Sequence, residues 1–263
     1  MRISKNILLK EIPFEARDCH ALELYLSEMA AKGWMLDEIW IFNIFKFKRC
    51  EPKKLRFAVD IPRLSDTCPD TSLQNYELLF NEYIEICESS GWKHIVEDSE
   101  YQIFCTEDIN VVDIQTDDSL KLDSLLKINS GYLIQMLSFF FLSMTWGKNN
   151  PTIESYSYGK LCMTIFYSSI TFFFGLNFLE DLLWKLSAKK SLKEGNIVKY
   201  PGLSSFKIKL LIQKYDSVAI IILLVGIFIL QNEKQIIYLI LAFSIGFIIL
   251  TIMLLVNIIK NHS

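Results

Sequence analysis

An acid, a thiol and an imidazole stand side by side near the start of the chain, as Asp18, Cys19 and His20. A cysteine becomes a nucleophile when a histidine base lies within hydrogen-bonding distance of it. Successive residues of a helix point about 100° apart, however, so this thiol and this imidazole are not expected to face each other. Asp18 is instead expected to begin a helix, as its N-cap or first-turn acid. We therefore predict that these residues are structural and that the chain is not an enzyme.

The other histidines and cysteines do not indicate a metal site. None of the three histidines stands three or four residues from another histidine or from a cysteine pair, and the six cysteines show no paired spacing. The sequence also lacks the motifs that carry nucleotide, serine-hydrolase and zinc-protease chemistry. We predict no catalytic residue, no cofactor-binding residue and no metal ligand.

A cluster of basic residues lies in the first quarter of the chain. Its members are Lys46, Lys48, Arg49, Lys53, Lys54 and Arg56. Each such charge adds about 1 kcal/mol to binding near an anionic membrane, so the cluster is a candidate contact for a lipid head group or a protein partner. The alternative, which we favour, is a solvated hairpin end, with some of these lysines pairing to the acidic second half of the domain.

Charge is divided unevenly along the chain. Residues 1–127 carry 15 basic and 24 acidic side chains, whereas residues 128–263 carry 12 basic and 6 acidic ones. The acidic excess of the first part falls mostly on residues 71–127. Proteins that bind nucleic acid need lysine and arginine for phosphate contacts. We therefore predict no direct binding of nucleic acid.

The second half of the chain contains long apolar runs. A helix that crosses the hydrocarbon core of a bilayer needs roughly 20 residues. Four runs approach or reach this length, at residues 128–146, 161–179, 210–230 and 236–259. Between Lys185 and Lys214 there are eight lysines and one acid, which places this loop in the cytoplasm by the positive-inside rule. We predict four transmembrane helices in contact with the lipid bilayer, with both termini in the cytoplasm.

Polar residues follow the second apolar run. Asn177, Glu180 and Asp181 stand near the predicted cytosolic interface, with Lys185 one helical turn beyond Asp181. Ionisable residues inside a membrane tend to mark function, so these three are a candidate polar site at the membrane edge. The simpler interpretation is pairing with Lys185 or solvation by head groups.

One sequence unit recurs in the polar first half. The segments at residues 21–34 and 79–92 both have a helical pattern and end in Gly-Trp. Gly33 and Gly91 are expected to end these helices in the left-handed conformation. An edge strand is predicted at residues 6–12, and two hairpins are predicted, one of 39–48 with 54–61 and one of 94–97 with 101–105. The order predicts an α+β fold of the ferredoxin-like type, with helices on one face of an antiparallel sheet.

The predicted organisation is therefore a cytosolic domain at residues 1–112, a polar linker at 113–127 and a membrane domain at 128–263.

Several phrases of the first half resemble a known family. They are DCHALELYLSEMAAKGWML (18–36), EPKKLRFAVDI (51–61), ESSGWKHI (88–95) and QIFCTED (102–108). Together they are similar to the bacterial membrane-protein family catalogued as the domain of unknown function number 2812. The resemblance covers roughly residues 14–127 and implies a bacterial plasma-membrane protein. It also implies a cytosolic partner, a PadR-type transcriptional regulator, because such regulators are often encoded beside members. It implies no activity, cofactor or catalytic residue.

These patterns together favour a role in binding. We predict a membrane-tethered regulatory or sensing protein that binds a cytosolic protein partner through its N-terminal domain. The alternative is an accessory subunit or small transporter for an amphiphile.

Overall fold

The computed structural model describes residues 5–12, 15–40, 43–62, 73–97, 101–116, 118–127, 131–146, 157–215 and 233–262. The chain forms two compact units. Unit 1 comprises Met1–Asn129 and Ser187–Phe206, and unit 2 comprises Ser130–Leu186 and Lys207–Ser263. Each unit is described by itself.

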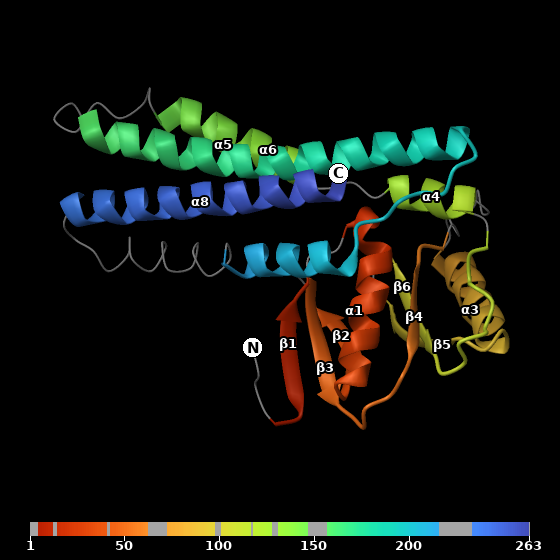
Figure 1. The fold of residues 1–263 in the computed structure, drawn as a ribbon. Helices are drawn as coiled ribbons and strands as arrows, with labels where there is room; N and C mark the ends of the chain where they lie inside the picture. Colours follow the sequence, from red (N-terminus) through yellow and green to blue (C-terminus); the bar gives the residue numbers. More distant parts are fainter. Residues whose placement is uncertain are drawn as a thin grey trace. The chain divides into compact units, whose positions relative to one another are not determined.

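Unit 1 contains two consecutive β-α-β-β repeats (Figure 1). The first repeat consists of β1 (Ile7–Glu11), α1 (Cys19–Ala31), β2 (Trp34–Trp40) and β3 (Ile44–Arg49), with the short helix η1 (Ala16–Asp18) before α1. The second consists of β4 (Arg56–Asp60), α3 (Leu73–Ser89), β5 (Lys93–Glu97) and β6 (Gln102–Thr106). Each repeat forms an antiparallel three-stranded sheet in which its last strand lies in the centre, in the orders β1-β3-β2 and β4-β6-β5. The repeat seen in the sequence thus corresponds to a repeat in the order of the elements and in the pairing of the strands.

The predicted ferredoxin-like sheet is wrong, because the strands form two separate sheets. The hairpin predicted between residues 39–48 and 54–61 is also wrong. Both edges of β3 are occupied, by β1 and by β2, so β4 has no free edge of β3 to pair with and instead pairs with β6. The prediction of β1 as an edge strand is confirmed, and so is the hairpin of β5 with β6.

Each helix of unit 1 buries one apolar face. On α1 the buried side chains include Leu22, Leu26 and Met29, at the i, i+4, i+7 spacing of a helical stripe. This helix packs against β2 of its own repeat and against β4 of the second. On α3, Cys87 is buried in a cluster with Trp92 and Phe104. α1 therefore joins the two repeats.

The Gly-Trp pairs end the helices as predicted. Gly33 has φ 79° and Gly91 has φ 97°, both in the left-handed region that side chains with a Cβ rarely adopt. The Gly33 amide donates to the Ala30 carbonyl at 2.9 Å. After α3, the Trp92 amide donates to the Cys87 carbonyl at 3.1 Å, which closes the helix end in the manner of a Schellman motif.

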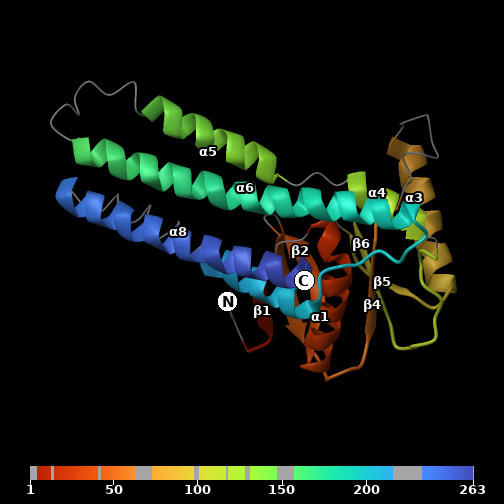
Figure 2. The same cartoon turned by 45° about the horizontal axis from the view of Figure 1, so that its top comes forward.

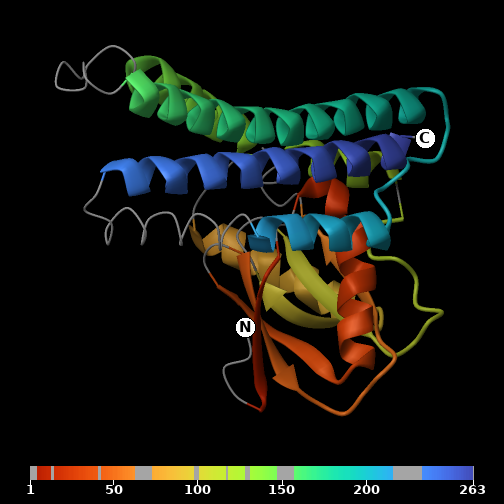
Figure 3. The ribbon, with the colours of Figure 1, turned by 60° about the vertical axis from the view of Figure 1, so that its left-hand side comes forward.

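Unit 2 is helical. It contains α5 (Tyr132–Trp146), α6 (Ser157–Lys193) as far as Leu186, a helix that continues from residue 207 to 215, and α8 (Glu233–His262). Figure 2 shows α5, α6 and α8 running side by side, and Figure 3 shows α6 alongside α8. Phe166 and Phe173 of α6 contact Phe247 of α8 with ring centroids 6.2 and 6.1 Å apart. Aromatic side chains thus make up much of the core of this unit.

The prediction of four transmembrane helices is wrong. Among the residues that the structure describes, one helix is long and apolar enough to cross a membrane, the 19-residue segment Tyr238–Val256 of α8. The apolar part of α5 is shorter, at Tyr132–Met144. In α6 the apolar pattern is interrupted by polar side chains, including Asn177, Glu180 and Asp181. Most of the predicted span at 210–230 lies outside the described residues.

Valine at either cap glycine should destabilise the protein. A Cβ at Gly33 would lie 2.8 Å from the Cys50 carbonyl oxygen, and a Cβ at Gly91 would lie 2.9 Å from a methyl carbon of Val111. We expect each substitution to cost more than about 1 kcal/mol in the free energy of unfolding, with the larger loss for Gly33→Val, because a backbone carbonyl yields less than a side chain. Thermal unfolding of the full chain measures this.

The control is Gly202→Ala, since a Cβ there meets nothing within 4 Å. Melting temperatures of both valine variants equal to that of the control would contradict the cap assignment.

Candidate functional site

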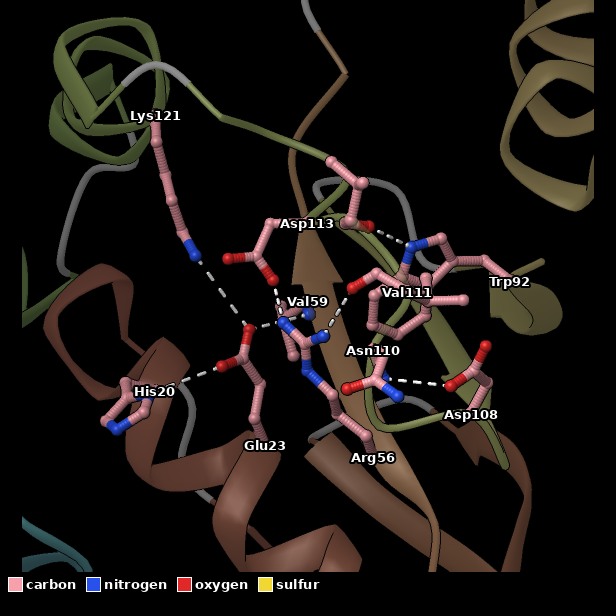
Figure 4. A network of polar contacts seen from close by, with 11 residues as sticks. His20, Glu23, Arg56, Val59, Trp92, Asp108, Asn110, Val111, Asp113 and Lys121 are labelled. Carbon is pink, nitrogen blue, oxygen red and sulfur yellow. Dashed lines mark hydrogen bonds and ion pairs between the residues drawn. The ribbon is translucent and has the colours of Figure 1, made fainter. Parts of the chain in front are cut away.

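A polar pocket of about 240 Å³ lies in unit 1 between α1, β4 and the segment that follows β6. We call residues 107–116 the strap, because this segment leads from β6 to the helix α4 (Asp118–Lys127). Figure 4 shows five of the titratable side chains at the pocket, those of His20, Glu23, Arg56, Asp113 and Lys121. Those that line it are His20 and Glu23 from α1, Arg56 and Asp60 from β4, Asp113 from the strap and Lys121 from α4.

Glu23 contacts residues of several elements that line this pocket. Its Oε1 accepts a hydrogen bond from the Val59 backbone amide at 3.0 Å, and the same oxygen lies 4.0 Å from Lys121 Nζ. Its Oε2 lies 3.4 Å from His20 Nδ1. One carboxylate therefore contacts α1, β4 and α4 (Figure 4).

The strap is held against the second repeat by two side chains. The Arg56 guanidinium forms an ion pair with Asp113 and donates from Nη1 to the Val111 carbonyl at 2.7 Å. Trp92 donates from Nε1 to the Val112 carbonyl at 2.9 Å. The guanidinium also lies 5.3 Å from the centre of the Trp92 ring, within range of a cation–π interaction. Arg56 and Trp92 together fix the strap.

Asp60 forms the inner polar contact of the pocket. Its Oδ2 accepts a hydrogen bond of 2.5 Å from the Tyr83 hydroxyl of α3. Burial raises the pKa of Asp60 above its ordinary value, although the bond from Tyr83 opposes this shift. Burial and the neighbouring Asp60 carboxylate raise the pKa of Tyr83. This pair links α3 to β4.

Cys19 and His20 occupy different surroundings. Cys19 is fully buried, and burial raises the pKa of its thiol, which disfavours the nucleophilic thiolate. His20 is more than half exposed and directs Nδ1 towards Glu23. The structure thus gives the imidazole a carboxylate partner.

The predicted basic cluster is distributed over several ion pairs. Lys46 lies 2.9 Å from Asp37 and 3.0 Å from Glu38, and Lys48 lies 2.5 Å from Asp37. Arg49 donates to the Lys32 carbonyl at 3.1 Å.

The rest of the cluster, Lys53, Lys54 and Arg56, lies just before β4 or at its first residue. Lys53 lies 2.7 Å from Glu107 at the start of the strap, and Arg56 lines the pocket, whereas Lys54 is exposed. Of the six predicted residues, the pocket therefore contains Arg56.

The candidate polar site predicted at Asn177, Glu180 and Asp181 lies on α6. The Asn177 side chain donates to the Phe173 carbonyl at 2.9 Å, and Asp181 pairs with Lys185 at 3.0 Å. Glu180 is buried, as are Asn177 and Asp181. The pairing of Asp181 with Lys185 matches the simpler interpretation of this set.

Glu23, Asp60 and Lys121 were not identified from the sequence. The only local signal is the i, i+3 spacing of His20 and Glu23 on one helix, which brings the two side chains to one face. Asp60 and Lys121 come from distant parts of the chain, and only the tertiary fold brings them to Glu23.

His20 should titrate above its ordinary range. Its hydrogen bond to Glu23 raises its pKa above its ordinary value, against opposing effects of burial and Lys121. A raised histidine pKa stabilises the fold below the unfolded pKa, and this stabilisation is lost as the pH rises through the folded pKa. We expect proton NMR of the His20 imidazole in the full chain to show this shift, with the assignment made from a His20→Gln variant.

The matched control is Glu23→Gln. Its amide oxygen can still accept from Val59, but the charge is removed, so the pKa of His20 should fall towards its ordinary value. An imidazole that titrates identically in both proteins would refute the pairing.

One of three comparisons with known proteins gives a match. Searches of curated proteins and of solved structures find no match. A family model described as protein of unknown function matches residues 18–137, which include every residue that lines the pocket. Residues 18–137 of this chain are therefore similar to the family DUF2812, proteins of unknown function.

Proposed function

We propose that this protein is a membrane-tethered regulatory or sensing protein that acts by binding. In this proposal, unit 1 binds a cytosolic protein partner, for which a PadR-type transcriptional regulator is the first candidate. The tether is α8, the membrane is the bacterial plasma membrane, and unit 1 lies on its cytoplasmic side.

The observation that carries the proposal is the composition of the pocket wall. Glu23 and Val59 belong to the repeats, Asp113 belongs to the strap, and Lys121 belongs to α4. The strap and α4 lead along the chain to the apolar helices. An occupant of the pocket would therefore contact the repeats and the segment that follows them simultaneously. Binding at such a site can change the position of the strap. A regulatory protein requires a conformational change of this kind on binding.

The proposal that α8 is the tether rests on the exposure of its apolar side chains. The segment Tyr238–Val256 has a mean hydropathy of 3.0, yet only 28% of its apolar window is buried inside the protein. A helix at the core of a water-soluble protein would be buried on most sides, because exposed apolar surface costs free energy in water. Ile245, Ile249 and Ile252 are each more than half exposed. A lipid environment accounts for this face.

A charge at the mouth of the pocket should reduce partner binding. Leu24 lines the pocket on α1 and is 39% exposed, so Leu24→Lys would add a cation at the entrance without opening the core. We expect retention of the purified PadR-type regulator by the full-length protein in detergent to fall about tenfold, the effect of roughly 1.4 kcal/mol.

The matched control is Leu78→Lys, because Leu78 is an exposed leucine on α3, outside the pocket. Equal retention by wild type and both variants would show that the pocket is not the docking site. Failure of the wild type to retain the regulator would remove this partner.

Two lysines on the exposed face of α8 should weaken membrane attachment. In Ile245→Lys combined with Ile249→Lys, the two charges would cost roughly 5–7 kcal/mol at the centre of a span. In water these exposed positions would tolerate lysine. We expect the wild type to stay in the membrane pellet after alkaline carbonate extraction, and the double variant to be released or degraded.

The control is Ile109→Lys in the strap, where the isoleucine is 80% exposed. Recovery of the double variant in the pellet at the wild-type level would count against α8 as the tether.

A further inference from the structure

One side of β4 is not paired with another strand. In the order β4-β6-β5, β6 pairs with one side of β4, and the pocket of unit 1 lies against this strand. Four consecutive residues of β4 line the pocket, from Phe57 to Asp60. Side chains of a strand alternate between its two faces, so four neighbours in a row indicate that the pocket opens on the edge of the strand. The pocket therefore gives access to the backbone of β4.

The hydrogen bond of Val59 shows how this edge is oriented. The Val59 amide donates to Glu23 Oε1 at 3.0 Å, so it points away from β6 (Figure 4). In an antiparallel pair, every second residue directs its amide and carbonyl to the neighbouring strand, and the residues between them direct theirs to the other side. Phe57, two residues before Val59, therefore also directs its amide and carbonyl outwards, whereas Ala58 and Asp60 direct theirs to β6.

Phe57 presents a backbone donor and a backbone acceptor at the pocket. Among the residues that the structure describes, none outside the sheet forms a hydrogen bond with the Phe57 backbone. The Phe57 side chain is buried, so the residue is held in place from the inside of the unit. An unbonded donor and acceptor on the edge of a sheet are the groups with which an added strand pairs.

The charged side chains at the pocket do not select a charged ligand, because they already contact one another. The Arg56 guanidinium pairs with Asp113, and the Glu23 carboxylate lies 3.4 Å from His20 Nδ1. A ligand that used these charges would have to break existing ion pairs. The outward groups of Phe57 require no such exchange. A polypeptide backbone is therefore the chemistry that this edge fits.

Glu23 occupies the next position along the same edge. Its Oε1 accepts from Val59 at the place where a carbonyl of an added strand would accept. Replacement of one oxygen acceptor by another leaves the Val59 amide bonded, so the cost of an unpaired amide is avoided. The displaced carboxylate can keep its contact with His20 through Oε2. Glu23 is thus a competing acceptor that a bound segment can replace.

The size of the pocket limits what can pair with β4. Its volume of about 240 Å³ is below the range of about 300–1,000 Å³ for sites that hold drug-sized ligands. A segment that pairs with both Phe57 and Val59 needs three residues, which is about 10 Å of extended chain. The pocket therefore excludes a folded domain and suits a loop or a terminus in an extended conformation.

We propose that the outer edge of β4 pairs with a short extended segment of the protein partner. A carbonyl of the segment accepts from the Phe57 amide, and an amide of the segment donates to the Phe57 carbonyl. A further carbonyl takes the place of Glu23 at Val59. This inference rests on the proposed function and adds the means of recognition, which is the backbone of a loop or terminus.

Amide hydrogen exchange of the full-length protein in detergent, resolved to single residues, tests this pairing. Saturation with the purified PadR-type regulator should slow exchange of the Phe57 amide at least about tenfold, because an added strand protects it with a hydrogen bond. The amides of Ala58 and Asp60 already bond within the sheet and should change much less. In one segment of the regulator, alternate amides should slow as well. The internal control is β3, whose two sides are both occupied.

The outcomes separate this inference from the proposed function. Retention of the regulator with unchanged exchange at Phe57 would overturn the pairing and leave partner binding intact. Equal slowing of all amides from 56 to 60 would indicate general stabilisation of β4 in place of strand addition, and would also overturn it. Failure of the protein to retain the regulator would remove the proposed partner, and this inference with it.

A variant of Glu23 tests the replacement at Val59. Glu23→Ala should bind the regulator about three- to tenfold more tightly, because no side chain then competes for the Val59 amide. A role in folding alone would give weaker binding. The matched control is Glu28→Ala, which removes the same charge from α1 outside the pocket and should change the Kd by less than about twofold. Equal gains in both variants, or no gain in a folded Glu23→Ala variant, would overturn the proposed replacement.

Discussion

The hydrogen bond from the Val59 amide to Glu23 is the contact on which the arrangement of unit 1 depends. β4 is an edge strand, because β6 occupies only one of its sides. The amide of Val59 would otherwise remain unpaired at this edge, and unpaired edges destabilise a sheet and invite unwanted pairing. A carboxylate from the first repeat satisfies it. The bond therefore fixes α1 against the second sheet and leaves the other oxygen of Glu23 for His20 at the pocket.

Local features of unit 1 could be predicted from the sequence, whereas pairing between distant segments could not. Gly33 and Gly91 were predictable because a helix end needs a left-handed residue, and this requirement concerns only a few neighbouring residues. The partner of β4 was mispredicted because closeness in the sequence favoured β3, although β1 had already taken the free edge of that strand. Glu23 and Asp60 gave no functional signal in the sequence for a similar reason. Glu23 binds Val59 and Asp60 binds Tyr83, and in each pair the two residues are distant in the sequence and belong to different elements.

The apolar half shows a different limit of sequence reasoning. Hydropathy averaged along a segment indicates length and composition, but it does not show which face of a helix is polar. α6 buries Asn177, Glu180 and Asp181 and exposes Leu179 and Leu183. Between residues 177 and 183, three polar side chains of α6 thus lie inside and two leucines lie outside, whereas Phe166 and Phe173 of the same helix are also buried. The structure shows that the three residues of the predicted polar set are buried, and that Asn177 lines a cavity together with Lys209, which the sequence did not reveal.

β4 is the element through which a change at the pocket would reach the strap. Within five residues this strand provides the amide bound by Glu23, the guanidinium that holds the strap, and the carboxylate bound by Tyr83. An occupant that drew Glu23 away would leave the Val59 amide without its acceptor, at a cost of about 1–3 kcal/mol unless the occupant replaced the bond. The edge of β4 could recover that energy by shifting, and Arg56 is part of the same strand. A shift of β4 would therefore move the Arg56 contacts with Asp113 and Val111, so that binding and the position of the strap are energetically coupled through one short strand.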